Sequence, residues 1–219
     1  MASRPARSTR VPRRTRADAG TPRATERDLR LLRTVAEQYA ITLPQLAAMM
    51  DRSIHAARWL RDRWRAAGWI DSRTVLVDRP VFLWATRAGV QAVGLHYPGW
   101  GPTPGVLAHV EAVTDVRLHL QASGPDLGWV SERDITLAAR GAHRPDGLLV
   151  VGDSEVAVEV ELTRKARLRA RGIMCELVAR YPGAVYFAAD GTRPLLEDLA
   201  AEVGQGRVQV RPLPEGAVG

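Results

Sequence analysis

The chain has 219 residues, of which 46% are hydrophobic, so it is long enough for two small domains or one larger domain with an ordinary buried core. No apolar run approaches the roughly 18 to 20 residues of a membrane span, and the arginine-rich start is not followed by the apolar segment of a secretory signal. The single cysteine, Cys175, excludes an internal disulfide and a cysteine-based zinc cluster. We therefore expect a cytoplasmic protein that makes no contact with a membrane.

Positive charge is concentrated at the front of the chain. Residues 1–23 carry seven arginines and one aspartate, residues 24–95 carry eleven arginines and seven acids, and residues 104–219 carry 13 basic and 16 acidic groups. A basic front end is typical of proteins that bind a phosphate backbone. A solvated tail is the alternative interpretation of residues 1–23. Only one of the 31 basic residues, Lys165, is a lysine.

The first part of the chain predicts an arm followed by three helices. Residues 1–23 lack apolar periodicity, which is typical of a disordered arm. Apolar residues then recur at helical spacing, and Ser, Thr and Asp stand where helix caps are expected. The predicted helices cover residues 25–39, residues 42–50 and, capped by Asp51 or Ser53, the residues up to Ala67.

A hairpin and a further short helix complete this region. Segments 69–77 and 80–86 are rich in Val, Trp and Thr and are separated by turn-forming residues, which predicts two paired strands. A short helix is predicted over 86–95. This succession indicates a winged helix-turn-helix domain over residues 24–95. Residues 96–105, with three prolines and three glycines, are predicted to be a linker.

Residues 106–213 predict a second domain. The expected order of elements is αβββαβαβ, which is typical of a mixed sheet with helices against its faces. The predicted elements are helices over 106–122, 164–180 and 194–203 and strands over 128–138, 147–151, 155–162, 184–188 and 207–212. The whole chain is therefore expected to be of the α/β (α+β) class.

The predicted third helix carries arginines on the face opposite its apolar residues Leu60 and Trp64. In a helix-turn-helix, residues near the start of this helix reach base edges, and later cations hold phosphates of double-stranded DNA. We expect Arg52, Ser53, His55 and Arg58 to enter the groove, Arg61 and Arg65 to contact the backbone, and Arg73 and Arg79 to add contacts from the wing. A solvated arginine stripe or a dimer surface is the alternative.

Two glutamates share one face of the strand predicted over 155–162. Alternation along a strand places Glu159 and Glu161 together at the apolar centre of the domain, which is costly unless a metal or another cation is near. Asp146, at the start of the neighbouring strand, can supply a third carboxylate, and Mg²⁺ or Mn²⁺ suits such oxygen ligands. We expect Asp146 and Glu159 to bind the metal and a nearby lysine, Lys165, to orient water or stabilise charge during phosphodiester hydrolysis. A solvated acidic edge strand is the alternative, and no motif indicates a small-molecule cofactor.

These residues resemble a known superfamily. Pro145 and Asp146, thirteen positions before Glu159 on adjacent strands, are similar to the PD-(D/E)xK nucleases over about residues 104–190. The resemblance implies a restriction-endonuclease-like αβββαβ core and metal-dependent DNA cleavage, or a domain that keeps the fold and has lost catalysis. Where the family has its lysine, this chain has Glu161, so Glu161 or a displaced Lys165 would take that role. Glu111, on the preceding helix, matches a further acidic metal ligand of such nucleases.

Both parts in this order are similar to the actinobacterial replication-relaxation proteins of plasmids and other mobile elements. The similarity rests on TERDLRLLRTVAEQYAITLPQLAAMM with the later RPDG and EVEL segments, and it implies a role in replication or transfer of mobile DNA.

Three functional hypotheses follow from the sequence. In the first, the protein is nucleoid-associated, with a homodimer as a possible state, and its DNA-binding domain positions an endonuclease on DNA. In the second, the protein is a sequence-specific regulator whose second domain is inert and serves dimerisation or partner binding. In the third, the basic arm over residues 1–23 tethers the protein to RNA or to a partner protein.

Overall fold

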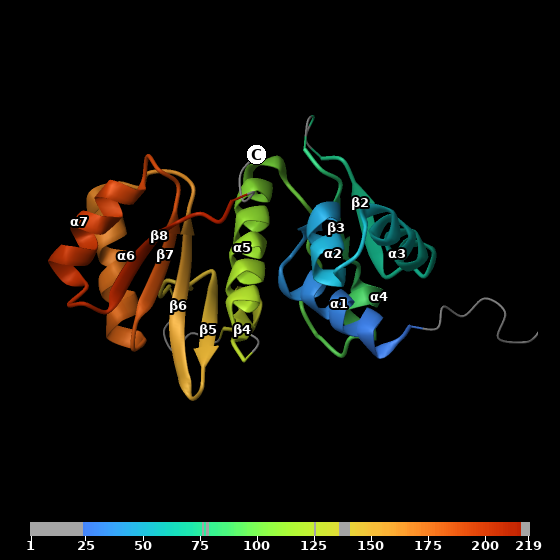
Figure 1. The fold of residues 1–219 in the computed structure, drawn as a ribbon, viewed down its shortest axis with the longest axis horizontal. Coiled ribbons are helices and arrows are strands. Elements are labelled where there is room, and N and C mark those ends of the chain that lie inside the picture. The colour runs from blue at the N-terminus through green and yellow to red at the C-terminus, as the bar shows by residue number, and fades with distance from the viewer. Residues whose placement is uncertain (1–23, 76, 78, 125, 136–140, 216–219) are drawn as a thin grey trace, which may run out of the picture.

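The computed structural model describes residues 24–75, 77, 79–124, 126–135 and 141–215. Over these residues the chain forms a mixed α/β structure with seven α-helices, a three-stranded antiparallel sheet and a five-stranded mixed sheet. Figure 1 shows two halves side by side, the first blue to green and the second lime to red, with helix α5 between them. The predicted arm over residues 1–23 lies outside the described residues.

Three helices begin the first half: α1 (Glu26–Glu37), α2 (Leu43–Met50) and α3 (Ile54–Ala66). The threonine before α1 and the threonine before α2 each form a capping box with the third residue of the helix. Ser53 caps α3 without a capping box, since its hydroxyl oxygen accepts a hydrogen bond from the N–H of Ala56. Each cap satisfies a backbone N–H that the first turn leaves without a partner, which is why the helices begin at the predicted positions.

A small antiparallel sheet follows, with strands in the order β1 (Ile41–Thr42), β3 (Phe82–Ala85) and β2 (Ile70–Arg73). Helix α4 (Arg87–Ala92) follows β3. The predicted pairing of β2 with β3 is confirmed. The two-residue strand β1 was not predicted, because it is too short to show an alternation of apolar and polar residues.

The second half contains the five-stranded sheet, in the order β4-β5-β6-β7-β8. The first three strands are antiparallel to one another, and β7 and β8 run parallel to β6. The predicted order αβββαβαβ is confirmed. The bounds are α5 (Pro104–Ser123), β4 (Gly128–Ser131), β5 (Gly147–Val151), β6 (Ser154–Glu161), α6 (Arg167–Arg180), β7 (Ala184–Ala188), α7 (Arg193–Val203) and β8 (Val208–Pro212).

Helices cover both faces of this sheet. Apolar side chains of α6 and α7, such as Met174 and Leu199, pack on one face, and those of α5, such as Val116, pack on the other. Figure 1 shows the resulting layers from left to right as helices, sheet and α5. Among the described residues, no helix is long and apolar enough to cross a membrane.

The strand predicted over 128–138 is shorter than expected. It ends at Ser131 and continues as a 3₁₀ turn, Glu132–Asp134. The Ser131 hydroxyl accepts a hydrogen bond from the N–H of Arg133 and donates one to the carbonyl of Glu37 in the first half. This local bonding gives the backbone an alternative to the sheet ladder. Residues 136–138 lie outside the described part of the chain.

Helix α5 joins the two halves. Its residues Leu107 and Val110 pack with Phe82 and Trp84 of the first half, whereas other apolar residues of α5 face the large sheet. A helix that is apolar on several sides is buried on several sides. The predicted linker, residues 96–105, also contacts the second half, because the carbonyl of Pro98 accepts a hydrogen bond from Arg133, which follows β4.

Candidate functional site

The hairpin of β5 and β6 positions the acids that the sequence indicated. Gly147 pairs with Val158, so Asp146, one residue before β5, lies opposite Glu159. Glu161 is two residues further along β6 and shares the face of Glu159. This is the face on which α6 and α7 pack. The structure therefore brings the carboxylates of Asp146 and Glu159 to neighbouring strands at one end of the hairpin.

Both carboxylate oxygens of Asp146 have partners. Oδ2 accepts a hydrogen bond of 2.7 Å from the backbone N–H of Val160, which ties the side chain to β6. Oδ1 lies 2.8 Å from Nε2 of His109 on α5. The hydrogen bond that His109 donates to Asp146 raises the pKa of His109, because it stabilises the charged imidazolium. Both α5 and the sheet thus fix the position of Asp146.

Glu159 is the most deeply buried of the acids, at 2% exposure. Burial, followed by the negative charge of Asp146, raises the pKa of Glu159 to about 7. Its Oε1 lies 2.8 Å from Nε2 of His143. On the neighbouring strand, the hydroxyl of Tyr186, opposite Glu159, is buried without a hydrogen-bond partner in the part of the chain that the structure describes. A buried carboxylate that titrates near neutrality is a candidate functional group.

Glu161 and Lys165 form an ion pair. The Lys165 ammonium donates a hydrogen bond to Oε1 of Glu161, and Lys165 is partly exposed whereas Glu161 is buried. The predicted reach of Lys165 back to the acids is therefore present. The predicted helix over 164–180, which would have contained Lys165, begins too early. Helix α6 begins at Arg167, so Lys165 lies in the loop before it.

Two histidines of the site were not predicted. His109 and His143 stand alone in the sequence, and no spacing relates them to the acids. Only the packing of α5 and of the segment before β5 brings each ring to one carboxylate. Glu159 and, through space, Asp146 also raise the pKa of His143.

Glu111, predicted as a metal ligand, does not join the acids. Two residues along a helix correspond to a rotation of about 200°, so Glu111 points away from the side of α5 on which His109 meets Asp146. Its carboxylate lies 3.7 Å from the guanidinium of Arg79 in the first half. Burial raises the pKa of Glu111 and Arg79 opposes this effect. Arg79, predicted to contact DNA, thus pairs with an acid between the halves.

The residues at this end of the hairpin fit a hydrated divalent cation. Mg²⁺ in proteins is held by one or two carboxylates and keeps several waters. Asp146 and Glu159 supply two carboxylates, and the Tyr186 hydroxyl has unused hydrogen-bonding capacity beside them. Within the described ranges, no group of three His, Cys, Asp or Glu side chains is arranged to hold a metal ion. A cation here would therefore take its remaining ligands from water or substrate.

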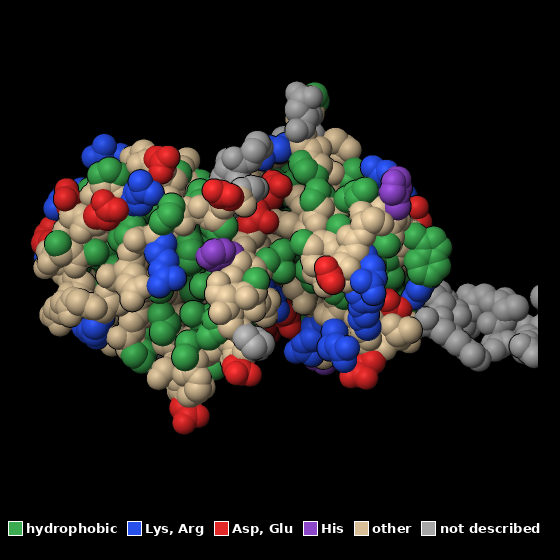
Figure 2. All heavy atoms as spheres, in the orientation of Figure 1, with side chains coloured by type: hydrophobic (Ala, Val, Ile, Leu, Met, Phe, Trp, Pro, Cys, Tyr) green, Lys and Arg blue, Asp and Glu red, His purple; other side chains and the backbone are tan. Residues whose placement is uncertain are grey.

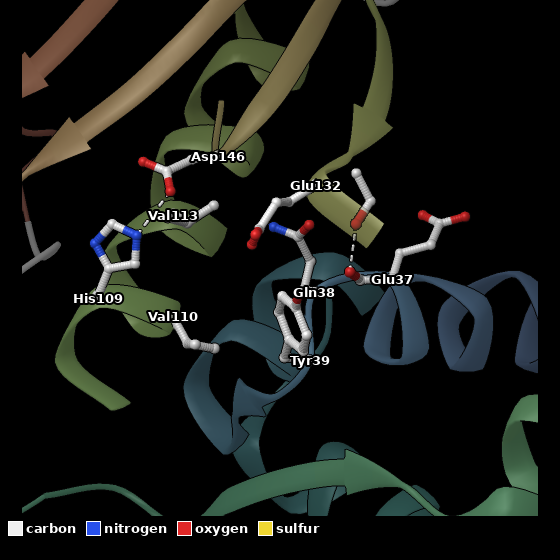
Figure 3. A pocket seen from close by; sticks show the side chains of 9 residues that line it. Glu37, Gln38, Tyr39, His109, Val110, Val113, Glu132 and Asp146 are labelled. Carbon is white, nitrogen blue, oxygen red and sulfur yellow. Dashed lines mark hydrogen bonds and ion pairs between the residues drawn. The ribbon is translucent and has the colours of Figure 1, made fainter. Parts of the chain in front are cut away.

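A small pocket lies beside Asp146 at the junction of the two halves (Figure 3). His109 and Val110 of α5 line one side, and Tyr39, just after α1, lines the other. Glu132 also faces this pocket, and burial together with the charge of Asp146 raises its pKa. The candidate site is thus bordered by residues of both halves.

The polar face of α3 carries the residues predicted to bind DNA. Leu60 and Trp64 are buried, as predicted. The exposed residues on and around this helix include the predicted Arg52, Ser53, His55, Arg58 and Arg65, and also Trp59 and the acids Asp51 and Asp62. Arg61 pairs with Asp62 at 2.8 Å. The guanidinium of Arg73 lies 5.6 Å from the ring centre of Trp84. Figure 2 shows Lys and Arg side chains gathered on the lower part of the first half, where Figure 1 places α1 rather than α3, whereas acids and bases mix on the outer helices of the second half.

Comparison with known proteins adds no assignment, because no family model and no curated protein matches this chain.

Proposed function

We propose that this protein binds double-stranded DNA through its first half and cleaves phosphodiester bonds at Asp146 and Glu159, with Mg²⁺ or Mn²⁺ as cofactor. The observation that carries the proposal is the pair of carboxylates of Asp146, just before β5, and Glu159, opposite it on β6. One is fixed by the Val160 N–H, and the other is 2% exposed with a pKa raised to about 7. A buried carboxylate whose pKa is raised toward neutrality, next to a second carboxylate, is typical of functional sites.

Each residue has a definite task in this proposal. Asp146 and Glu159 would hold the cation, and the chemistry that a divalent cation supplies there is polarisation of the scissile phosphate. Lys165, held by Glu161, would orient the attacking water or stabilise negative charge on the phosphate. The pairing of β5, β6 and β7 between α5 and α6 supports a PD-(D/E)xK-like core.

The first half would hold the DNA. Three helices with an antiparallel hairpin support a winged helix-turn-helix, and the exposed arginines Arg58 and Arg65 of α3 are suited to phosphate contacts. Replication or transfer of mobile-element DNA, by a monomer or homodimer near the nucleoid, is the biological setting we propose.

Incubation of supercoiled plasmid with the protein in Mg²⁺, Mn²⁺ or EDTA tests cleavage. Asp146→Asn and Glu159→Gln keep the shape of each side chain, and we expect each to reduce metal-dependent nicking by at least about 100-fold. Asp153→Asn is the matched control, because Asp153 is an exposed acid in the turn of the same hairpin. Nicking that persists in both site variants would overturn the catalytic assignment.

A second candidate function rests on the partners that the acids already have. His109 pairs with Asp146, His143 with Glu159 and Lys165 with Glu161, so charge in the site is compensated without a metal. This observation favours a DNA-binding regulator whose second half is an inert dimerisation or partner platform. Retardation of DNA without cleavage, equal in the wild type and in Asp146→Asn, would support it.

A further inference from the structure

A second pocket lies next to the candidate site, and aromatic rings and arginines line it. Tyr39, Tyr97 and Trp100 supply the rings, and Arg133 and Arg144 supply the guanidinium groups. The volume of this pocket is about 160 Å³. Tyr39 also lines the pocket that contains Asp146, so the two pockets share a wall.

The aromatic residues of this pocket are held in place by contacts between the two halves. The Arg133 guanidinium lies over the rings of both Tyr39 and Tyr97, 4.8 and 4.2 Å from their centres. The Tyr97 hydroxyl donates a hydrogen bond to Asp134. Trp100 packs on Tyr39 with ring centres 5.6 Å apart and remains partly exposed. The indole of Trp100 therefore presents ring surface to the pocket.

The backbone of Tyr39 is also unusual. Helix α1 ends at Glu37 with Gln38 as its cap, and Tyr39 follows with φ of 65°. Glycine is the usual residue at this left-handed position, because a side chain there is unfavourable. In this conformation the ring of Tyr39 lies between the two pockets. Backbone outliers of this kind occur at binding sites.

Arg144 connects this pocket to the acids. It stands two residues before Asp146, and its side chain is exposed. It makes no hydrogen bond or ion pair with another described residue, and its charge acts through space on Glu132 in the neighbouring pocket. Arg133, in contrast, is already hydrogen bonded to the carbonyls of Ala36 and Pro98. Arg144 is therefore the cation of this pocket that is suited to hold a phosphate from outside.

We propose that this pocket binds an unpaired nucleobase of a DNA strand that passes Asp146, with the base against Trp100 and its phosphate on Arg144. Inside a duplex the faces of the bases are stacked on one another, so an aromatic pocket can accept only a base that has left the stack. The substrate is then DNA with unpaired nucleotides beside a duplex, as in a fork or gap. This inference rests on the proposed function for its DNA substrate, and it is independent of cleavage.

Binding measured in EDTA tests the proposal without cleavage. The probes are a blunt duplex and a forked duplex of the same sequence that carries 2-aminopurine at the first unpaired position. We expect the fork to bind more tightly and the 2-aminopurine fluorescence to be quenched by stacking. Trp100→Ala should weaken fork binding by about 5- to 150-fold, the range measured for loss of one stacked base, and change duplex binding less than about twofold. Trp100→Phe should retain most of the affinity, and Arg144→Ala should weaken fork binding selectively.

Trp59→Ala is the matched control, because Trp59 is an exposed tryptophan of α3 that does not line this pocket. It should change fork and duplex binding by the same factor. Equal affinity of the wild type for fork and duplex, or an equal loss on both probes in Trp100→Ala, would overturn the proposal. Absence of plasmid nicking with a retained, Trp100-dependent fork preference would refute the catalytic assignment alone.

Discussion

The imidazole of His143 lies 2.8 Å from the carboxylate of Glu159, in a place where the glutamate is only 2% exposed. The pKa values of both groups are raised, that of Glu159 mainly by burial and that of His143 mainly by its hydrogen bond to Glu159. The protonation state of this pair therefore depends on pH near neutrality, and the stability of the fold depends on it as well.

Replacing Glu159 should flatten the dependence of stability on pH. A folded-state pKa of about 7, against 4.5 in the unfolded chain, means that the folded protein holds this proton more tightly. The stabilisation is complete below pH 4.5 and is lost as the pH rises through about 7, which amounts to about 3 kcal/mol. The raised pKa of His143 acts in the same direction.

Urea unfolding in EDTA measures this effect. Between about pH 5 and about pH 8, the free energy of unfolding should decline less for Glu159→Gln than for the wild type. Glu155→Gln, at the exposed end of β6, is the control, and identical slopes in all three proteins would refute the prediction.

Removing arginines from α3 should weaken DNA binding in a manner that depends on salt. Each phosphate contact contributes about 0.9 to the slope of log affinity against log salt concentration. We expect Arg58→Ala and Arg65→Ala each to reduce that slope by about 0.9 on a duplex of arbitrary sequence. Arg30→Ala removes the same charge from α1, where Arg30 already pairs with Glu26, and should leave the slope unchanged. If all three variants behave alike, α3 is not the DNA-binding face.

Breaking the buried ion pair between the halves should destabilise the protein strongly. Arg117 of α5 lies 2.9 Å from Glu37 of α1, and their side chains are 7% and 11% exposed. Among the described residues, Arg117→Ala leaves the carboxylate of Glu37 with the partly exposed Arg33 as its ionic partner, and we expect a loss of about 3 kcal/mol in the free energy of unfolding. Glu26→Ala breaks the exposed pair with Arg30 and should cost less than about 1 kcal/mol. Denaturant unfolding distinguishes the two, and equal losses would contradict the assignment of a buried pair.

Two glycines should respond oppositely to replacement by alanine. A Cβ at Gly147 would lie 2.1 Å from Cζ2 of Trp129, so the indole would have to move and stability should fall by about 1 to 3 kcal/mol. Gly172, inside α6, has open space around it, and Gly172→Ala should raise stability by about 0.5 to 1 kcal/mol. Thermal unfolding of the two variants measures both effects. A neutral Gly147→Ala would mean that Trp129 does not pack against the start of β5.

The order and type of most elements could be predicted from local sequence. Capping residues such as Ser53 determine where helices begin, and apolar periodicity distinguishes α5 from the strand β6, because both signals act within a few residues. The same local information places Glu159 and Glu161 on one face of β6. Local information does not show contacts between distant parts of the chain, such as the hydrogen bond from the hydroxyl of Ser131, where β4 ends, to the carbonyl of Glu37.

The sequence by itself determined the α/β element order, the charged face of α3 and the carboxylates that share one face of β6, since each follows from side chains near one another along the chain. Tertiary structure alone decided that His109 and His143 meet those carboxylates and that Glu111 turns away toward Arg79. It also decided that residues 96–105, predicted as a linker, line an aromatic pocket beside Asp146. Such contacts depend on how helices rotate and how two halves pack, and no spacing along the chain encodes them.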